Sequence, residues 1–430
     1  MKIGIFQLNG CTKCRNELIN LIGNSELLIR NVKDYEEDTD VKLIWCTDQE
    51  NLPTSVDIAI FSGYATSDNL HCLKEIRKIA NQLYAFGSCA TDGGIFGLAY
   101  QKGVEILPVS KIISVDHEIK GCLASGEHLL ALLKDFSPYS IEKLCDKCQR
   151  ESTCSFLEEI VHQVDLQELD EKQCFNDVGY TCSGYIANNC QERCIDFGTP
   201  CRGCNPFLED ASIRMLGMMG TLMGQMEVAT EASTKGATDK LSDVEDEISE
   251  AYSDIVGTFF RFTLANAPIP PGKIPSTGNI MADIMVGRPI QELPLITGMM
   301  GGKNFISLTI DILDAYEQGL KLEMDDELKL IRNQLLELEE KYQLASEEMD
   351  PKLYAEATGN IRKLAGNMNL SNLYFGGMKT KLESYRNFEH FQAHPVPIQE
   401  GTYTSSSKNV TFTLDSRGII TKWESKNYEL

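Results

Sequence analysis

Short apolar runs alternate with segments of helical spacing through the first 140 residues. The apolar runs are rich in Ile, Val, Leu and Phe, as buried strands are; they are Lys2–Gln7, Val41–Cys46, Asp57–Ser62, Leu83–Gly87 and Lys111–Asp116. Helical spacing falls between them, on Glu17–Gly23, Asn69–Asn81 and Gly126–Leu133. This alternation predicts an α/β domain over residues 1–140, with a doubly wound, flavodoxin-like parallel sheet.

The pattern is different after residue 266. A proline-rich stretch, Ala267–Gly272, predicts an extended linker. Beyond it, Leu328–Glu347 carries apolar residues at helical spacing with charges between them, which predicts an amphipathic helix. Val410–Glu424 alternates as a terminal hairpin does, with Arg417 and Gly418 at its turn. We therefore expect residues 267–430 to form a mainly helical extension.

All fifteen cysteines lie between Cys11 and Cys204, and nine of them fall within residues 145–204. Thiolates separated by only a few residues can wrap a polynuclear metal centre, so the pattern indicates iron–sulfur ligation. Structural zinc is the alternative, with one pair of ligands at Cys145 and Cys148 and another at Cys201 and Cys204. One zinc ion needs only four ligands, and nine cysteines are present. We expect residues 141–266 to form a cysteine-rich iron–sulfur domain.

Four further cysteines follow the predicted strands of the sheet. Cys11 and Cys14 come after the first strand, Cys89 after the fourth and Cys122 after the fifth. Because ligands of an open parallel sheet gather beyond the carboxyl ends of its strands, these four thiolates are expected to converge, and four suffice for one [4Fe–4S] cluster. Cys46 and Cys72 do not fit this geometry and are expected to be small buried residues.

Composition and charge exclude several classes of protein. The chain has 430 residues and a formal net charge of −23, with no basic patch, so nucleic acid is not an expected partner. No segment approaches 18 uninterrupted apolar residues, and the N-terminus shows no signal peptide, which predicts a cytoplasmic protein without a membrane span. Thiols stay reduced there, and an odd number of cysteines argues against a disulfide scaffold.

Taken together, the cysteine motifs resemble those of a known family, the small subunits of [NiFe] hydrogenases. The likeness is to the cytoplasmic group, namely the methyl-viologen-reducing subunit that works with heterodisulfide reductase and the sulfhydrogenase small subunit. The motifs that carry it are Cys11/Cys14, Gly87–Gly94, Gly121–Glu127, Cys145/Cys148 and the run from Cys174 to Cys204. The chain departs from the family at Lys13, where glycine is usual, and at Leu123–Ser125, where prolines are usual; these changes affect hydrogen bonding around a cluster without removing a ligand.

The resemblance implies three [4Fe–4S] clusters and assigns each cysteine motif to one of them. The proximal cluster takes Cys11, Cys14, Cys89 and Cys122; the medial cluster takes Cys190, Cys194, Cys201 and Cys204; the distal cluster takes Cys145, Cys148, Cys174 and Cys182. Cys154 is then the spare cysteine, although it could replace Cys174 or Cys182 as a ligand.

The resemblance also implies a function, the transfer of electrons between a nickel–iron site in a large partner subunit and a downstream acceptor. That acceptor would be a heterodisulfide reductase-type subunit, a flavin or nicotinamide module, or a ferredoxin. No catalytic residue is expected in this chain, and Glu17 is expected to be a solvated glutamate of a first helical turn. The C-terminal extension is expected to dock the large subunit or the next carrier.

Two other functions compete with this one. One is an iron–sulfur relay of the complex I type, which carries adjacent cysteines after its first strand, whereas Cys11 and Cys14 are separated here. The other is a zinc-binding interaction protein without redox activity, which metal analysis would distinguish.

Overall fold

The structure, a computed structural model, describes most of the chain. The described residues are 2–23, 42–46, 52–133, 142–153, 157–206 with short gaps, a few positions between 213 and 250, 251–379 with gaps at 268–274 and 349, and 396–428. Cys154 and the side chain of Cys46 lie outside this set.

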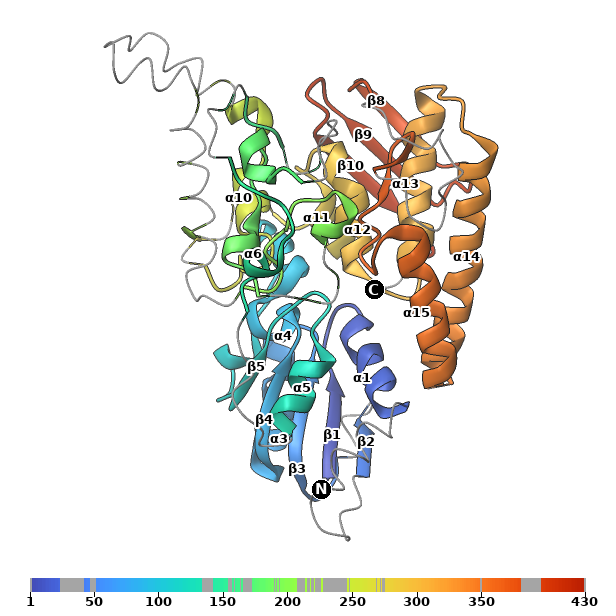
Figure 1. Ribbon diagram of the computed structural model, residues 1–430. Coiled ribbons are helices and arrows are strands. Elements are labelled where there is room, and N and C mark those ends of the chain that lie inside the picture. The colour runs from blue at the N-terminus through green and yellow to red at the C-terminus, as the bar shows by residue number, and fades with distance from the viewer. Residues whose placement is uncertain are drawn as a thin grey trace, which may run out of the picture.

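A five-stranded parallel sheet forms the N-terminal part, in the order β2-β1-β3-β4-β5 (Figure 1). Its strands are β1 (Lys2–Gln7), β2 (Lys42–Cys46), β3 (Val56–Ser62), β4 (Ala80–Phe86) and β5 (His117–Ile119). This order is that of a flavodoxin-like doubly wound sheet. The predicted α/β class with a parallel sheet is confirmed.

Helices cover both faces of this sheet, because alternate residues of each strand point to opposite sides. On one face, Ile5 of β1 packs with Leu18 of α1 (Lys13–Gly23) and Leu129 of α5 (Gly126–Leu133). On the other face, the neighbouring Phe6 belongs to the same cluster as Leu73 of α3 (Leu70–Ile79).

The fifth strand begins later than the sequence predicted. Lys111–Asp116 was expected to be a strand, but the chain first makes a 3₁₀ turn, η3 (Val109–Lys111), and only His117–Ile119 pairs with β4. The apolar residues Ile112, Ile113 and Val115 pack against the α3 face of the sheet instead of joining it. Asp116 marks the change, because its backbone N–H donates to the Leu83 carbonyl (2.9 Å) and its carboxylate accepts from the Leu83 N–H (2.7 Å).

Several short helical elements lie outside the main helices. In the sheet domain, η1 (Ser67–Asn69) precedes α3, and α4 (Ser88–Asp92) and η2 (Gly94–Lys102) follow β4. The cysteine-rich segment itself holds α6 (Leu144–Lys147), η4 (Phe175–Val178), η5 (Ser183–Tyr185) and η6 (Cys194–Phe197), and α10 (Ile255–Phe259) follows. Loops dominate among the described residues of this segment.

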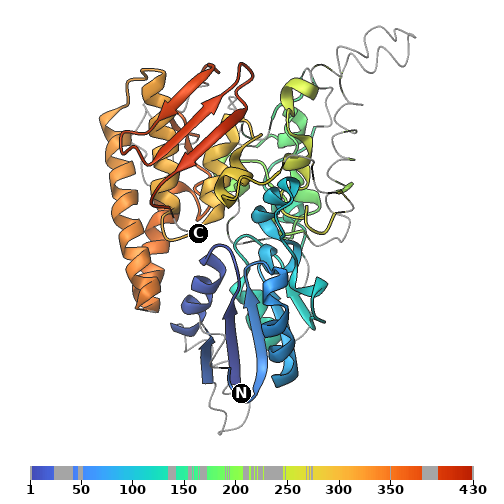
Figure 2. The same cartoon turned by 180° about the vertical axis from the view of Figure 1, so that it is seen from behind.

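The C-terminal region combines helices with a small sheet. Its elements are α11 (Ile280–Met285), η8 (Ile290–Glu292), α12 (Leu293–Met300), α13 (Phe305–Gly319), α14 (Asp326–Glu347), α15 (Pro351–Ala365), β6 (Leu373–Tyr374), β7 (Gly377–Met378), β8 (Gly401–Thr404), β9 (Val410–Leu414) and β10 (Ile420–Ser425). The predicted helix corresponds to α14, and the predicted hairpin to the antiparallel pair β9 and β10. Strand β8, which was not predicted, completes a three-stranded sheet that covers the helices in Figure 2.

One hydrophobic core joins the C-terminal region to the N-terminal part. It includes Phe96 and Leu98 of η2 together with Ile296 of α12 and Ile312 of α13. Helix α15 packs beside α1, as both views show. The carboxyl ends of the strands therefore point into the rest of the molecule (Figure 1).

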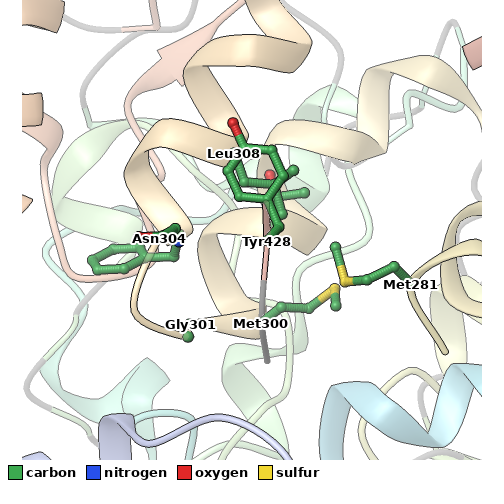
Figure 3. Close-up of a pocket in the computed structure, with 9 residues that line it drawn as sticks. Met281, Met300, Gly301, Asn304, Leu308 and Tyr428 are labelled. Carbon is green, nitrogen blue, oxygen red and sulfur yellow. The ribbon is translucent and has the colours of Figure 1, made fainter. Parts of the chain in front are cut away.

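A small apolar pocket lies within the C-terminal region (Figure 3). Met281, Met300, Leu308 and Tyr428 line it, and none of its nine lining residues is a cysteine. Gly301 forms one wall, and a Cβ atom there would come within 2.3 Å of the Lys13 side chain.

None of the helices that the structure describes combines the length and the apolar character that crossing a membrane requires.

Candidate iron–sulfur centres

Cys11, Cys14, Cys89 and Cys122 gather at the carboxyl ends of β1, β4 and β5. Cys11 follows β1, Cys14 lies in the first turn of α1, Cys89 lies in α4 and Cys122 follows β5. Burial and then the charges of Cys11, Cys122 and Cys14 raise the pKa of Cys89 well above its ordinary value. Burial, followed by the charge of Cys11, raises the pKa of Cys122 to about 12. The structure therefore brings together the four predicted proximal cysteines, which we call the proximal group.

Two glycines make room for the sulfur atoms of the proximal group. A Cβ atom at Gly87 would lie 2.6 Å from Cys14 Sγ, and one at Gly94 would lie 2.6 Å from Cys89 Sγ. Both residues also have positive φ angles, of 96° and 56°, which glycine adopts without strain. Any larger residue at these positions would push the thiols out of place.

Cys145, Cys148, Cys174 and Cys182 form a second group, the distal group. Cys145 lies in α6 and Cys148 follows it, whereas Cys174 and Cys182 directly precede η4 and η5. Burial and the charges of Cys148 and Cys174 raise the pKa of Cys145 to about 11. Burial, together with the charges of Cys145 and Cys174, raises the pKa of Cys182 to about 12. Cys145 is exposed, while Cys182 is buried.

Cys190, Cys194, Cys201 and Cys204 form the third, or medial, group. Burial and the charges of Cys182, Cys204 and Cys190 raise the pKa of Cys201 well above its ordinary value. Burial also raises the pKa of Cys204, with contributions from Cys190, Cys122 and Cys194. Cys194, Cys201 and Cys204 are all buried.

The medial group lies between the other two. Cys204 Sγ is 3.5 Å from the carbonyl oxygen of Cys122, a member of the proximal group. On the other side, the backbone N–H of Cys201 donates to Cys182 Sγ of the distal group at 3.3 Å. The three groups therefore follow one another in the order proximal, medial, distal.

The arrangement of these thiols fits iron–sulfur clusters. Among the described residues, no three His, Cys, Asp or Glu side chains are placed to hold a single metal ion. Three groups of four thiols are a donor set that iron–sulfur clusters take.

The remaining described cysteine is separate from the three groups. Cys72 lies in α3, is partly exposed, and has a pKa raised by burial alone. It packs against the apolar cluster on the α3 face, but it is partly exposed and not fully buried as predicted.

Lys13, between Cys11 and Cys14, is buried and ties the proximal group to the C-terminal region. Its Nζ donates to the carbonyls of Gly298 (2.5 Å) and Met368 (2.6 Å) and lies 3.9 Å from the centre of the Phe305 ring. Burial lowers the pKa of Lys13, whereas the charges of Cys122 and Cys11 act in the opposite direction. The sequence identified Lys13 as a departure from the family. It could not predict the acceptors of its hydrogen bonds, because they are backbone carbonyls far along the chain.

Two carboxylates near these groups are also buried. Glu17, on α1, was expected to be solvated, and this expectation is wrong because only 3% of it is exposed. Glu192, which the sequence did not single out, pairs with Arg362 at 2.8 Å and accepts the backbone N–H of Met368 at 2.7 Å. Both cases show helix α15 and its following loop covering α1 and the cysteine-rich segment.

Comparison with known proteins shows what this chain is similar to. The family described as NADH ubiquinone oxidoreductase, 20 Kd subunit, matches residues 11–136, which contain the whole proximal group. More specific matches are to hydrogenase subunits. The chain is 27% identical to a subunit of the F420-non-reducing hydrogenase of Methanothermobacter marburgensis, over 63% of this chain and 96% of the relative. It is 24% identical to the delta subunit of sulfhydrogenase 2 of Pyrococcus furiosus, over 54% of this chain and 98% of the relative.

A third relative carries the cofactor class in its name. This is the iron-sulfur subunit of the F420-non-reducing hydrogenase of Archaeoglobus profundus, 22% identical over 63% of this chain and 98% of the relative. The matches confirm the predicted resemblance to [NiFe] hydrogenase small subunits and the predicted class, an oxidoreductase component of a hydrogenase.

Solved hydrogenase structures are also similar over part of the chain. One is the [NiFeSe] hydrogenase of Desulfovibrio vulgaris Hildenborough, with a TM-score of 0.33 and 16% identity over 49% of this chain and 95% of that one. The other is an NAD+-reducing [NiFe]-hydrogenase, with a TM-score of 0.26 and 21% identity over 33% of this chain and 94% of that one. Both TM-scores are low and carry no argument about function.

Proposed function

We propose that this chain is the electron-transferring small subunit of a [NiFe] hydrogenase of the cytoplasmic group. It would carry electrons between the nickel–iron site of a large partner subunit and a downstream acceptor, through three [4Fe–4S] clusters. The observation that supports this most is the gathering of twelve cysteines into three groups of four that follow one another in space.

Each group would hold one cluster. The proximal cluster would bind to Cys11, Cys14, Cys89 and Cys122, the medial cluster to Cys190, Cys194, Cys201 and Cys204, and the distal cluster to Cys145, Cys148, Cys174 and Cys182. Such clusters supply one-electron transfer when bound, and that chemistry is the cofactor's own. The chain's part is to hold the thiolates, exclude water and set the local charge.

The two ends of this series differ in access. Cys11 and Cys122 of the proximal group are buried, while Cys145 of the distal group is exposed. We propose the distal side as the point where the downstream acceptor docks, whether that is a heterodisulfide reductase-type subunit, a flavin or nicotinamide module or a ferredoxin. No residue of this chain is assigned a catalytic role, since hydrogen would be split in the large subunit.

Anaerobic purification of the native complex tests this function. We expect a nickel-containing large subunit to copurify, and the complex to reduce viologen dye with hydrogen. A preparation that contains iron and sulfide but shows no nickel and no hydrogen-dependent reduction would instead support a relay of the complex I type, the class whose family name matches residues 11–136. Zinc in place of iron would contradict both.

A further inference from the structure

The loop that follows α15 brings two polar side chains to a sulfur of the medial group. Asn367 Nδ2 donates to Cys194 Sγ at 3.5 Å, and Ser371 Oγ donates to the same sulfur at 3.8 Å. Asn367, Ser371 and Cys194 are all buried. These donors come from the C-terminal region, more than 170 positions along the chain from the cysteine, at sequence separations of 173 and 177.

The orientation of the Asn367 amide is determined by its other hydrogen bonds. Its Oδ1 accepts the backbone N–H groups of Asn369 (3.0 Å) and Ser371 (3.2 Å), so Nδ2 is the end that faces Cys194. Nδ2 also lies 3.2 Å from the Glu192 carbonyl and 2.9 Å from Ser371 Oγ. Ser371 Oγ accepts the bond from Asn367 Nδ2, so its hydroxyl proton can be donated to Cys194 Sγ.

Arg202 approaches the medial group from within the cysteine run itself. It stands between Cys201 and Gly203, and only 6% of it is exposed. Its Nε and Nη1 have no hydrogen-bond acceptor among the described residues. A guanidinium with unused donors in a buried site requires an acceptor, and the sulfide and thiolate sulfur atoms of a cluster are acceptors.

The charges of the medial thiolates act on this guanidinium. Burial is the largest effect and, with the charge of Arg261, lowers the pKa of Arg202 to about 10, while Cys194, Glu292 and Cys201 act in the opposite direction. Arg202 directly follows Cys201 in the chain, so its guanidinium belongs to the same loop as the medial cysteines.

Hydrogen-bond donors and positive charges beside a cluster bear on its redox behaviour, because a reduced cluster carries one more negative charge than an oxidised one. Donors and positive charges beside it stabilise the reduced form more and raise its reduction potential.

We propose that Asn367, Ser371 and Arg202 raise the reduction potential of the medial cluster. The three residues are positioning and charge-setting groups, not ligands. This inference rests on the proposed function, since it requires a cluster at the medial group. It also gives the C-terminal region a role in electron transfer that is independent of docking.

Redox titration of the anaerobically purified chain, followed by electron paramagnetic resonance, tests this inference. For Ser371→Ala we expect the oxidised-to-reduced ratio of one cluster at a fixed potential to rise about tenfold, which corresponds to a potential about 59 mV lower for a one-electron couple. Arg202→Met is expected to lower the same potential further, whereas Arg202→Lys, which keeps the charge, stays closer to the unchanged protein.

Two comparisons keep the test decisive. Thr199→Val removes a bond to the Ser371 carbonyl (3.4 Å) without removing a donor to Cys194, so it reports a structural effect alone and is expected to leave the potential unchanged. Iron is counted in every variant. If Ser371→Ala and Arg202→Met keep all their iron and their potentials do not move, or if Thr199→Val shifts the potential equally, the inference is wrong. Absence of any cluster signal in the unchanged protein would instead refute the proposed function.

Discussion

The distal group and the medial group are built in different ways. The described cysteines of the distal group lie within residues 145–182, on short turns, and Cys145 is exposed. The medial group is formed by a shorter run, residues 190–204, yet residues from the loop after α15 cover it, as the chain around α12 and α15 covers the proximal group. A region without cysteines thus supplies part of the environment of the proximal and medial groups. The ligands and their surroundings come from different parts of the chain.

Deleting residues 279–430 would remove the region that covers the medial and proximal groups, and it has the largest expected effect. The largest hydrophobic core spans η2 and the helices α12 to α15, so the truncated chain would expose a broad apolar surface and leave Lys13 and Glu192 without their partners. We expect loss of soluble, folded protein, measured by yield and circular dichroism. A soluble truncated chain with the iron content of the full chain would show that the C-terminal region is an appendage.

A buried ion pair offers a milder way to loosen the same region. Arg332 and Glu317 join α14 to α13 through two bonds of 2.6 and 2.8 Å, and both side chains are buried. Arg332→Leu leaves the Glu317 carboxylate buried without its partner, at a cost of about 3–5 kcal/mol in unfolding free energy. Thermal unfolding measures this cost.

The double variant Arg332→Leu with Glu317→Leu is the matched control. It removes both charges, so we expect it to recover most of the lost stability. A double variant as unstable as the single one would mean that the two residues stabilise the fold through packing and not through their charges.

Glu339 gives the C-terminal region a pH dependence. Burial raises the pKa of Glu339 from 4.5 to about 7, although its carboxylate accepts the backbone N–H of Ile306 at 2.6 Å. Because the folded pKa is above the unfolded one, its contribution is fully present below pH 4.5 and is lost as the pH rises through 7. In the unchanged protein we expect the unfolding free energy to fall by about 3 kcal/mol as the pH rises from 4.5 to 7, because of this carboxyl. Glu339→Gln has no titrating group at this position, so it should not show this fall.

Denaturant unfolding at pH 5 and pH 8 checks this expectation. The two proteins should differ in the slope of stability with pH, and not merely in stability. Equal slopes for Glu339→Gln and the unchanged chain would contradict a raised pKa at this carboxyl.

The exposure of Cys145 predicts the smallest effect. A chelator reaches an exposed ligand before buried ones, so iron should leave the distal group before the other two groups. Electron paramagnetic resonance during slow chelation would show one cluster signal fading first. Simultaneous loss of all signals would mean that the three groups open together.

Strand periodicity is a local property, so the sequence was sufficient to predict the parallel sheet. The order of the strands then places Cys11, Cys14, Cys89 and Cys122 beyond the carboxyl ends of the sheet. Their assignment to one cluster, and that of the other cysteines to two more, stays a prediction. The start of β5 was misplaced because Ile112 and Ile113 have the same apolar character in a strand as in a packed turn. Asn367 and Ser371 left no signal, since a single amide or hydroxyl in a loop has no periodicity and its partner lies far along the chain.

Iron content in matched cysteine variants tests the central claim most directly. The unchanged chain, purified without oxygen, should hold about twelve irons, and Cys89→Ser, Cys201→Ser and Cys145→Ser should each lower the iron content and alter a different cluster signal. Cys72→Ser, outside the three groups, should keep all the iron. A chain that contains no iron, or one in which Cys72→Ser loses as much iron as the other three variants, would contradict three clusters held in series.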